Sequence, residues 1–212
     1  NVTELPFNSD QFSTAHPALS PDEKTLYFAS NRPDSFGESD IYKVQINQDG
    51  SFGTPVNLGN SINTIGRESF PFITDENELY FASDGRPGLG GFDVFVTKIN
   101  PDGTCTDVQN VGESVNSAKD DFGYFIDTKT RRGFFSSNRS GGQGSDDIYQ
   151  FLETKRLRCE QELYGEITDE NSKEMLPNTT ISLYNKQFDL LNTIVSDSKG
   201  NYSLKVDCGQ DY

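Results

Sequence analysis

The feature that most constrains this chain is an internal repeat. A strand-like run ending in serine, a glycine-bearing polar loop and a second strand-like run beginning with aspartate occur three times in the 212 residues. The first serines of the three loops, Ser30, Ser83 and Ser137, fall 53 and then 54 residues apart. A repeat of this period indicates an array of equivalent units, each of which buries its apolar face against a neighbour.

Each copy is typical of four short β-strands joined by tight turns. In the first copy we expect strands at 15–19, 25–29, 41–46 and 55–58, with a hairpin turn of turn-forming residues at 47–50. The second copy follows the first nearly residue for residue. The third keeps three of the strands and then departs from the pattern.

The departure in the third copy indicates a domain boundary. Charged residues at 152–158 replace the expected hairpin and fourth strand, so we place the boundary near residue 156, with domains at 1–156 and 157–212. In the second domain we expect strands centred on 163–169, 180–184, 192–196 and 202–206. The sequence stops before the last strands of this domain.

Composition supports an all-β chain. Only 33% of the residues are hydrophobic, but 16 Phe and 9 Tyr are among them, and aromatic residues favour strands with cross-strand ring pairs. Turn-forming residues punctuate short apolar runs about every ten residues, as in sandwiches and barrels.

The net charge of −15 argues against nucleic-acid binding, because such a field repels phosphate backbones. We interpret the acidic residues mainly as a solvated surface that keeps the protein in solution. The remaining interpretation is weak binding of a divalent cation such as Ca²⁺, and we expect no other cofactor.

The repeated serine and aspartate residues suggest a carboxylate site at first sight. A catalytic constellation needs different residues in different roles at one place, whereas these recur once per copy. We therefore expect structural loop clasps, in which each aspartate accepts hydrogen bonds from backbone amides and from the loop serine. The residues concerned are Ser30, Asp40, Ser83, Asp93, Ser137 and Asp147.

Other signatures of catalysis are weak, so we do not expect an enzyme. His16 is the only histidine, and no Gly-x-Ser-x-Gly motif occurs, so neither a nucleophilic triad nor a zinc site can be assembled. The glycine-rich loops at 88–91 and 141–144 lack the Lys-Ser/Thr pair of a phosphate-binding loop. His16 precedes Pro17 at a strand start, where a structural role is favoured.

Residues that differ between the copies carry more functional information than those that repeat. Charged clusters of this kind and the aromatics of the long loops, which we expect to be exposed, are candidate partner contacts, because loops commonly present binding surfaces. For any one of them, solvated surface charge remains the alternative. The candidates are Phe36, Phe92, Arg67, Lys119, Arg131 and Arg132.

Four-stranded units stacked in series are blades of a β-propeller. Residues 20–22, 26–30 and 40–42, with Gly37, resemble the WD40-like repeats of TolB-type bacterial envelope propellers. The stretches at 5–10 and 16–22 resemble more particularly repeats in OmpA-family proteins of gliding and type IX-secreting bacteria. The last segment resembles the carboxypeptidase-regulatory-like, prealbumin-type sandwich of those proteins, at 163–165, 169, 176–181 and 197–202.

The resemblance implies a fold and a location. We expect a partial β-propeller of three four-stranded blades, followed by a truncated prealbumin-like β-sandwich, in a periplasmic protein associated with the outer membrane. Three blades cannot close a ring, since propellers take roughly four to eight. No signal peptide is visible at Asn1 and no apolar run is long enough to span a membrane, so we expect a mature product or a piece of a longer chain.

The periplasm is oxidising, and the last segment is bracketed by two cysteines. We predict a disulfide between Cys159 and Cys208, worth about 4 kcal/mol for a closed loop of about 50 residues. Cys105 is left over and is expected to remain a thiol.

The leading functional hypothesis is a non-enzymatic periplasmic scaffold or protein-interaction module supporting an outer-membrane complex in secretion, gliding or outer-membrane protein assembly. Peptidoglycan would be bound only through an OmpA-like domain absent from this chain. One alternative is a free TolB-like periplasmic binding propeller. The other is a glycan-active propeller enzyme, which needs non-equivalent acids converging at one place.

Overall fold

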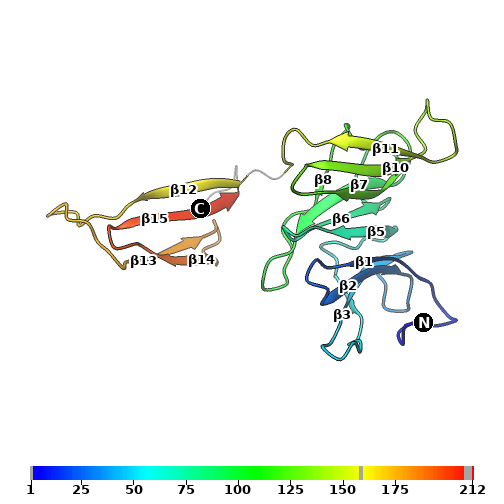
Figure 1. Ribbon diagram of the computed structural model, residues 1–212, viewed down its shortest axis with the longest axis horizontal. Coiled ribbons are helices and arrows are strands. Elements are labelled where there is room, and N and C mark those ends of the chain that lie inside the picture. The colour runs from blue at the N-terminus through cyan, green and yellow to red at the C-terminus, as the bar shows by residue number, and fades with distance from the viewer. Residues whose placement is uncertain (1, 158–159, 208–211) are drawn as a thin grey trace. The chain divides into compact units, whose positions relative to one another are not determined.

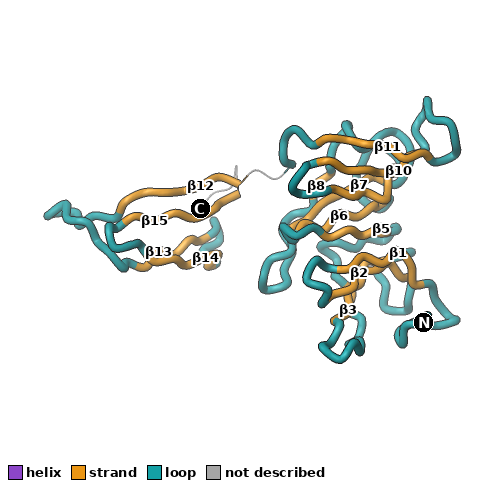
Figure 2. The backbone as a smooth tube through the Cα atoms, viewed as in Figure 1, coloured by secondary structure: helices purple, strands orange, loops and turns teal. Residues whose placement is uncertain are grey.

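The computed structural model describes residues 2–157, 160–207 and 212. Within these residues the chain is all-β, with fifteen strands in small antiparallel sheets and no helix (Figures 1 and 2). Accordingly, the described part contains no helix that could cross a membrane. The chain divides into two compact units, Asn1–Thr154 and Lys155–Tyr212, which are described separately below.

The first unit contains three antiparallel sheets, one for each copy of the repeat (Figure 1). The first two sheets have four strands in sequence order, and three strands are described for the third. The strands are β1 (Thr14–Leu19), β2 (Thr25–Ser30), β3 (Asp40–Gln45) and β4 (Val56–Asn57); β5 (Glu68–Ile73), β6 (Glu78–Ser83), β7 (Asp93–Lys98) and β8 (Gln109–Asn110); and β9 (Asp121–Ile126), β10 (Arg132–Ser137) and β11 (Asp147–Leu152).

The first strand of each sheet is bent at one equivalent position. His16, Phe70 and Gly123 stand third in β1, β5 and β9, with φ angles of 52°, 53° and 63°. The pairing of each of these strands with its neighbour shifts register at or beside this residue. Residues with a side chain seldom adopt such a φ, so the bulges at His16 and Phe70 are strained.

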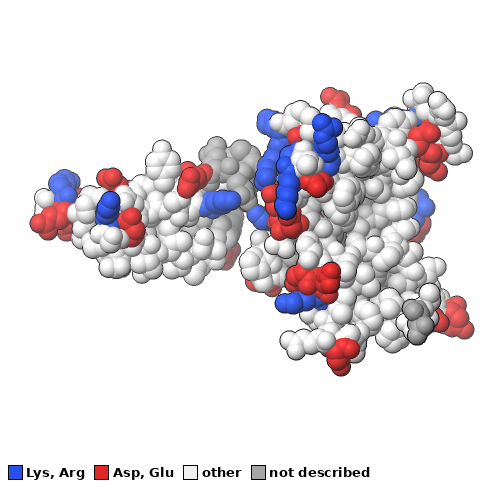
Figure 3. Space-filling view, in the orientation of Figure 1, with Lys and Arg blue, Asp and Glu red and all other residues white. Residues whose placement is uncertain are grey.

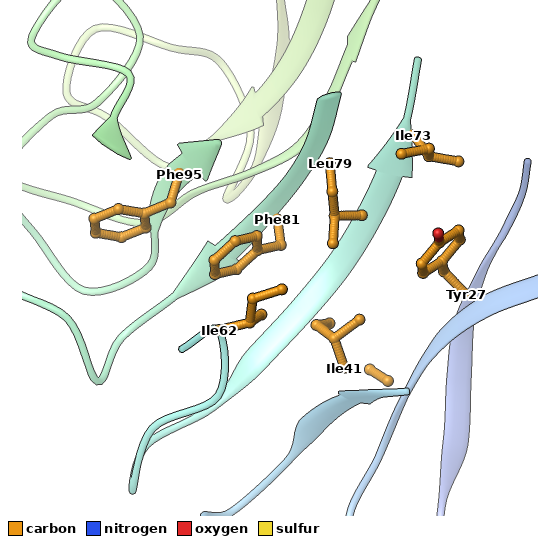
Figure 4. Close-up of a cluster of buried hydrophobic side chains, with 8 residues drawn as sticks. Tyr27, Ile41, Ile62, Ile73, Leu79, Phe81 and Phe95 are labelled. Atoms are coloured by element: carbon orange, nitrogen blue, oxygen red, sulfur yellow. The ribbon is translucent and has the colours of Figure 1, made fainter. Parts of the chain in front are cut away.

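Apolar side chains fill the spaces between consecutive sheets. In the first cluster, Tyr27 and Ile41 of the first sheet pack with Leu79, Phe81 and Phe95 of the second (Figure 4). A second cluster joins the opposite face of the middle sheet to the third sheet. Its buried members are Tyr80, Val94, Val96, Val111, Val115, Tyr124, Ile126 and Phe135. The middle sheet is therefore covered on both faces.

In each of the three sheets of the first unit, an arginine lies over two aromatic rings of that sheet. The guanidinium carbon of Arg32 is 5.1 Å from the Phe28 ring centre and 4.8 Å from that of Tyr42. Arg86 lies over Phe81 and Phe95 in the same way, and Arg139 over Phe135 and Tyr149. A cation over a ring face is attracted to the ring electrons, so this contact helps to fasten each long loop to its sheet.

The second unit consists of two two-stranded antiparallel sheets. Strands β12 (Glu160–Glu166) and β15 (Asn201–Asp207) form one, and β13 (Thr180–Tyr184) and β14 (Leu190–Val195) form the other. Cys159 and Cys208 lie outside the described residues, so their disulfide stays a prediction. In the first unit, Cys105 is half-buried beside the first apolar cluster.

Candidate functional site: an aromatic cluster on the first strands

The three repeated aspartates hold the long loops. Each carboxylate accepts hydrogen bonds from two backbone amides of the loop that precedes it. These donors are Phe36 and Gly37 for Asp40 (2.7 and 3.3 Å), Leu89 and Gly90 for Asp93 (2.6 and 3.1 Å), and Gln143 and Gly144 for Asp147 (2.8 and 3.2 Å). The carboxylates are thus engaged in local structure, one in each sheet.

The repeated serines bond other partners than the aspartates. The hydroxyl of Ser30 donates to the carbonyl of Ser13 at 2.7 Å, and that of Ser83 donates to the carboxylate of Glu68 at 2.6 Å. Ser137 accepts from Nε of Arg139 at 3.0 Å. The serine lies directly opposite the aspartate in each strand pair. The carboxylate nevertheless accepts from the loop amides. The serine hydroxyl instead bonds to the first strand, to the residue before it, or to the arginine.

Buried acids on the first strands were not singled out from the sequence. Glu68 accepts from the amide and hydroxyl of Thr64, both at 2.7 Å, as well as from Ser83. Burial raises the pKa of Glu68 above its ordinary value. Asp121, at the equivalent position in the third sheet, accepts from the amide and hydroxyl of Ser117. These acids brace the segments that connect the sheets, and within the described residues no group of three or more His, Cys, Asp and Glu side chains could hold a metal ion.

The predicted partner residues lie in different environments. Phe36 is 55% exposed, and Lys119 and Arg132 are exposed. Arg131 is half-buried instead, has a φ of 56°, and forms ion pairs with Glu153 and Glu76. Its guanidinium therefore takes part in internal ion pairs.

Arg67 and Phe92, which are far apart in sequence, meet in the structure. The guanidinium carbon of Arg67 lies 4.6 Å from the centre of the Phe92 ring, and its nitrogens reach Asp84 at 2.7 Å. Phe92 is half-buried rather than exposed as expected, because it also packs against Phe70. These two predicted residues thus belong to one larger group of rings.

That group is an aromatic cluster of His16, Phe70, Phe92 and Phe122, and Phe70 is its centre. The His16 ring stacks on Phe70 with 3.9 Å between centroids, Phe122 lies at 4.8 Å, and Phe92 meets Phe70 edge-on at 6.2 Å. All four side chains are half-buried. The cluster draws on the first strand of all three sheets and on the loop that leads into β7, so it forms only when the three copies stack.

The backbone at the cluster is strained where two of the rings attach. His16 and Phe70 both hold a left-handed φ, which costs on the order of 1–3 kcal/mol per residue. Such strain persists only where the surroundings impose it, and it is concentrated at ligand sites and switch regions. The outliers at His16 and Phe70 therefore mark this cluster as the leading candidate for a functional surface.

The chemistry of the cluster is that of an apolar platform with a charged rim. Burial lowers the pKa of His16 below its ordinary value, so its imidazole is neutral at pH 7. Its Nδ1 is buried without a hydrogen-bond partner among the described residues. Arg67, with Asp84 and Glu38 at 2.7 and 3.8 Å, adds charges of both signs at one edge. On the face drawn in Figure 3, basic side chains likewise lie among acidic ones.

Sequence reasoning did not find the centre of this site. The sequence favours a structural role for His16 and predicts Phe70 and Phe122 only as strand residues. The available signal was the repeat itself, because a period of 54 and then 53 residues places His16, Phe70 and Gly123 at one position. Neither protein-family models nor curated proteins match the sequence.

Proposed function

We propose that this chain is a non-enzymatic protein-interaction scaffold whose binding surface is the aromatic cluster. The observation that carries the proposal is that rings from three successive copies meet around Phe70 on strained backbone. Half-buried aromatic side chains beside an arginine are the side chains that dominate protein–protein contacts. The partner would present an apolar or aromatic side chain to the rings and a polar group to Arg67.

The arrangement of the acids favours binding over catalysis. A glycan-active enzyme needs non-equivalent carboxylates at one place. The equivalent aspartates instead accept amides of their own loops, and Glu68 and Asp121 brace the connecting segments.

For the fold, we propose that the three sheets are blades of a β-propeller and that the second unit is a prealbumin-like β-sandwich. Two four-stranded sheets and one sheet with three described strands, packed face to face in sequence order, support the first assignment. The WD40-like motifs and the pattern in the last segment carry the resemblance to OmpA-family envelope proteins.

That resemblance also carries the proposed location. The protein would lie in the periplasm and support an outer-membrane complex in secretion, gliding or outer-membrane protein assembly. Peptidoglycan would be reached through a domain outside this chain. A free TolB-like binding protein would share the fold and differ in forming only transient contacts.

Affinity capture from detergent-solubilised outer membranes tests the proposal. The wild-type chain should recover a stable set of membrane proteins. Phe92→Leu and His16→Gln, which alter the rim of the cluster and spare its centre, should reduce recovery by about tenfold, since one centrally placed interface side chain is commonly worth that much. Leu89→Ala is the matched control, because Leu89 is a loop residue that is 51% exposed.

Two outcomes would count against the proposal. If both cluster variants recover the same proteins in the same amounts as wild type, the cluster is not the binding surface. If wild type recovers nothing stably, a free binding protein is favoured over a scaffold. Near-ultraviolet circular dichroism of each variant ensures that a loss of binding is not a loss of fold.

A further inference from the structure

The segments that connect consecutive sheets share one asparagine contact. The side-chain amide of Asn63 accepts from the amide of Ile41 at 2.8 Å and donates to the carbonyl of Ile41 at 3.1 Å. Asn116 makes the same pair of bonds to Val94, at 2.8 and 2.9 Å. Both asparagines are buried. Each connecting segment therefore binds the outer edge of the third strand in the sheet that it leaves.

The arginine of the next sheet then closes over the same segment. Nη2 of Arg86 donates to the carbonyls of Ser61 and Ile62 at 2.6 and 2.9 Å. Nη2 of Arg139 donates in the same way to the carbonyl of Val115. The side chains of Ile62 and Val115 lie in the two apolar clusters. Each connecting segment is thus joined to the preceding sheet by its own asparagine and to the following sheet by the arginine of that sheet.

Residues 7–9 repeat this segment ahead of the first sheet. Thr64, Ser117 and Ser9 each accept from the amide two residues further on, at 3.1, 3.2 and 3.1 Å, which aligns the three segments. The first segment has one residue more before its strand, because Ser9 is five residues from Thr14 whereas Thr64 and Ser117 are four residues from Glu68 and Asp121. Phe7 then stands where Ile62 and Val115 stand, and it stacks on Phe28 at 5.1 Å. Asn8 stands where Asn63 and Asn116 stand, but its side chain is exposed.

The arginine of the first sheet lacks its expected acceptors. Arg32 is only 9% exposed, yet its Nη2 has no hydrogen-bond partner among the described residues. Oγ1 of Thr14 is likewise buried without a hydrogen-bond partner among the described residues. Thr14 occupies the position of Glu68 and Asp121, whose carboxylates hold the other two connecting segments. A buried donor without an acceptor costs about 1–3 kcal/mol, so this end of the array is suited to a further sheet that positions the segment before it.

At the other end of the array, the third sheet exposes the positions that are buried between sheets in the first two copies. Ile148 in β11 stands where Ile41 and Val94 stand, but it is 78% exposed, whereas they are buried. Phe134 stands where Tyr27 and Tyr80 are buried, and it is 44% exposed. Leu152 is also exposed, so the outer face of the third sheet is apolar and uncovered at these positions within the described first unit.

We propose that this outer face binds the first sheet of a second copy of the chain. The amide of Asn8 from that copy pairs with the main chain of Ile148, as Asn63 pairs with Ile41. The amide of Thr14 donates to the carbonyl of Asp146, as Glu68 donates to Ser39 at 2.8 Å and Asp121 to Phe92 at 2.7 Å. The new contact continues one that the chain already forms twice.

The association is head to tail, and it closes with two copies. Each copy has one end formed by the first sheet and the segment before it, and another formed by the outer face of the third sheet. A contact between two such different ends forms a ring when the rotation that relates the copies closes. Two copies bring together six sheets, within the range of roughly four to eight blades that closed propellers use. This closure rests on the propeller arrangement proposed above. Further repeats in a longer polypeptide would use the same contacts and are the competing occupant.

Sedimentation velocity of the 212-residue chain at concentrations up to about 100 µM tests the proposal, because the Kd values of standard-size interfaces extend from the picomolar to the micromolar range. Wild type should form dimers as concentration rises. Ile148→Asp places a carboxylate at the centre of the contact and should weaken association by about 100-fold or more. Asn8→Ala removes two hydrogen bonds and should weaken it by about tenfold. Ile65→Asp is the matched control, because Ile65 is 87% exposed away from both ends.

Three results would overturn the proposal. A wild-type chain that stays monomeric at every concentration favours an occupant within a longer polypeptide. If neither variant weakens the dimer, the dimer forms through another surface. If the chain forms open filaments, the proposed ring of two copies is wrong. Both altered side chains are exposed in the single chain, so neither variant should unfold it. If monomeric Ile148→Asp still captures the outer-membrane proteins, the cluster function stands without the dimer.

Discussion

Ile41 and Ile148 occupy one position of the repeat in opposite environments. Both stand directly after the aspartate that holds the long loop, yet Ile41 is 0% exposed and Ile148 is 78% exposed. The strands around them pair in the same register. The repeat sequence thus specifies a sheet and its loop, whereas burial of the sheet face depends on the unit that follows.

The first prediction compares these two positions and has the largest expected effect. Ile41→Ala leaves a cavity between two sheets and should reduce the free energy of unfolding by about 3–4 kcal/mol. Ile148→Ala should change it by less than about 0.5 kcal/mol in the dilute single chain, because little contact is lost. Urea denaturation of both variants measures the difference, and equal losses would contradict the comparison.

The second prediction compares the asparagines. Asn116→Ala leaves the buried amide of Val94 without its partner and removes one of the donors to the Val94 carbonyl, which keeps the amide of Val111 at 3.2 Å. It should therefore reduce the free energy of unfolding by about 2–3 kcal/mol. Asn8→Ala should cost less than about 0.5 kcal/mol in the dilute chain, because Asn8 is exposed. A large loss from Asn8→Ala in a monomer would show that it already bonds within its own chain.

The sequence was informative where structure is local. Strand pairing, the hairpin glycines at positive φ and the bonds from Asp40 to its loop amides follow from turn chemistry and alternation within one copy. Contacts between copies were not visible in this way. Phe92 was expected to be exposed, and the arginines over the rings were not anticipated, because both depend on how one sheet stacks on the next.

The same reasoning explains why the site was found only in part. Arg67 and Phe92 stood out because they differ between copies. His16 and Phe70 differ too, but their shared backbone strain appears only when the bulges of β1 and β5 are seen. Phenylalanine has no preference for a left-handed φ, and the modest enrichment of histidine in that region does not predict one inside a strand.

The third prediction compares two arginines and has a smaller effect. Arg86→Met keeps an apolar stem over Phe81 but loses two hydrogen bonds to carbonyls, which should cost about 1–2 kcal/mol of unfolding free energy. Arg32→Met should cost less, because Nη2 of Arg32 has no acceptor among the described residues. Thermal unfolding of both variants in dilute solution checks this order, and the reverse order would contradict it.

The fourth prediction concerns pH and is the smallest. Burial lowers the pKa of His16 in the folded chain, so the neutral form is favoured there. The stability that this contributes is present above the unfolded pKa of about 6.5 and is lost as the pH falls through the folded value. Wild type should therefore lose more stability than His16→Gln between pH 7.5 and about 5. Parallel pH profiles for the two chains would rule out this role for His16.

The most direct test of the account is amide hydrogen exchange at Ile148, because the amides of Ile41 and Val94 are held by Asn63 and Asn116. If a second copy supplies Asn8 to β11, exchange at Ile148 in the wild-type chain should slow by at least about tenfold between dilute and concentrated samples. It should stay fast in Asn8→Ala. Exchange at Ile148 that is fast at every concentration, while Ile41 and Val94 remain protected, would contradict the claim that the two ends of the array fit each other.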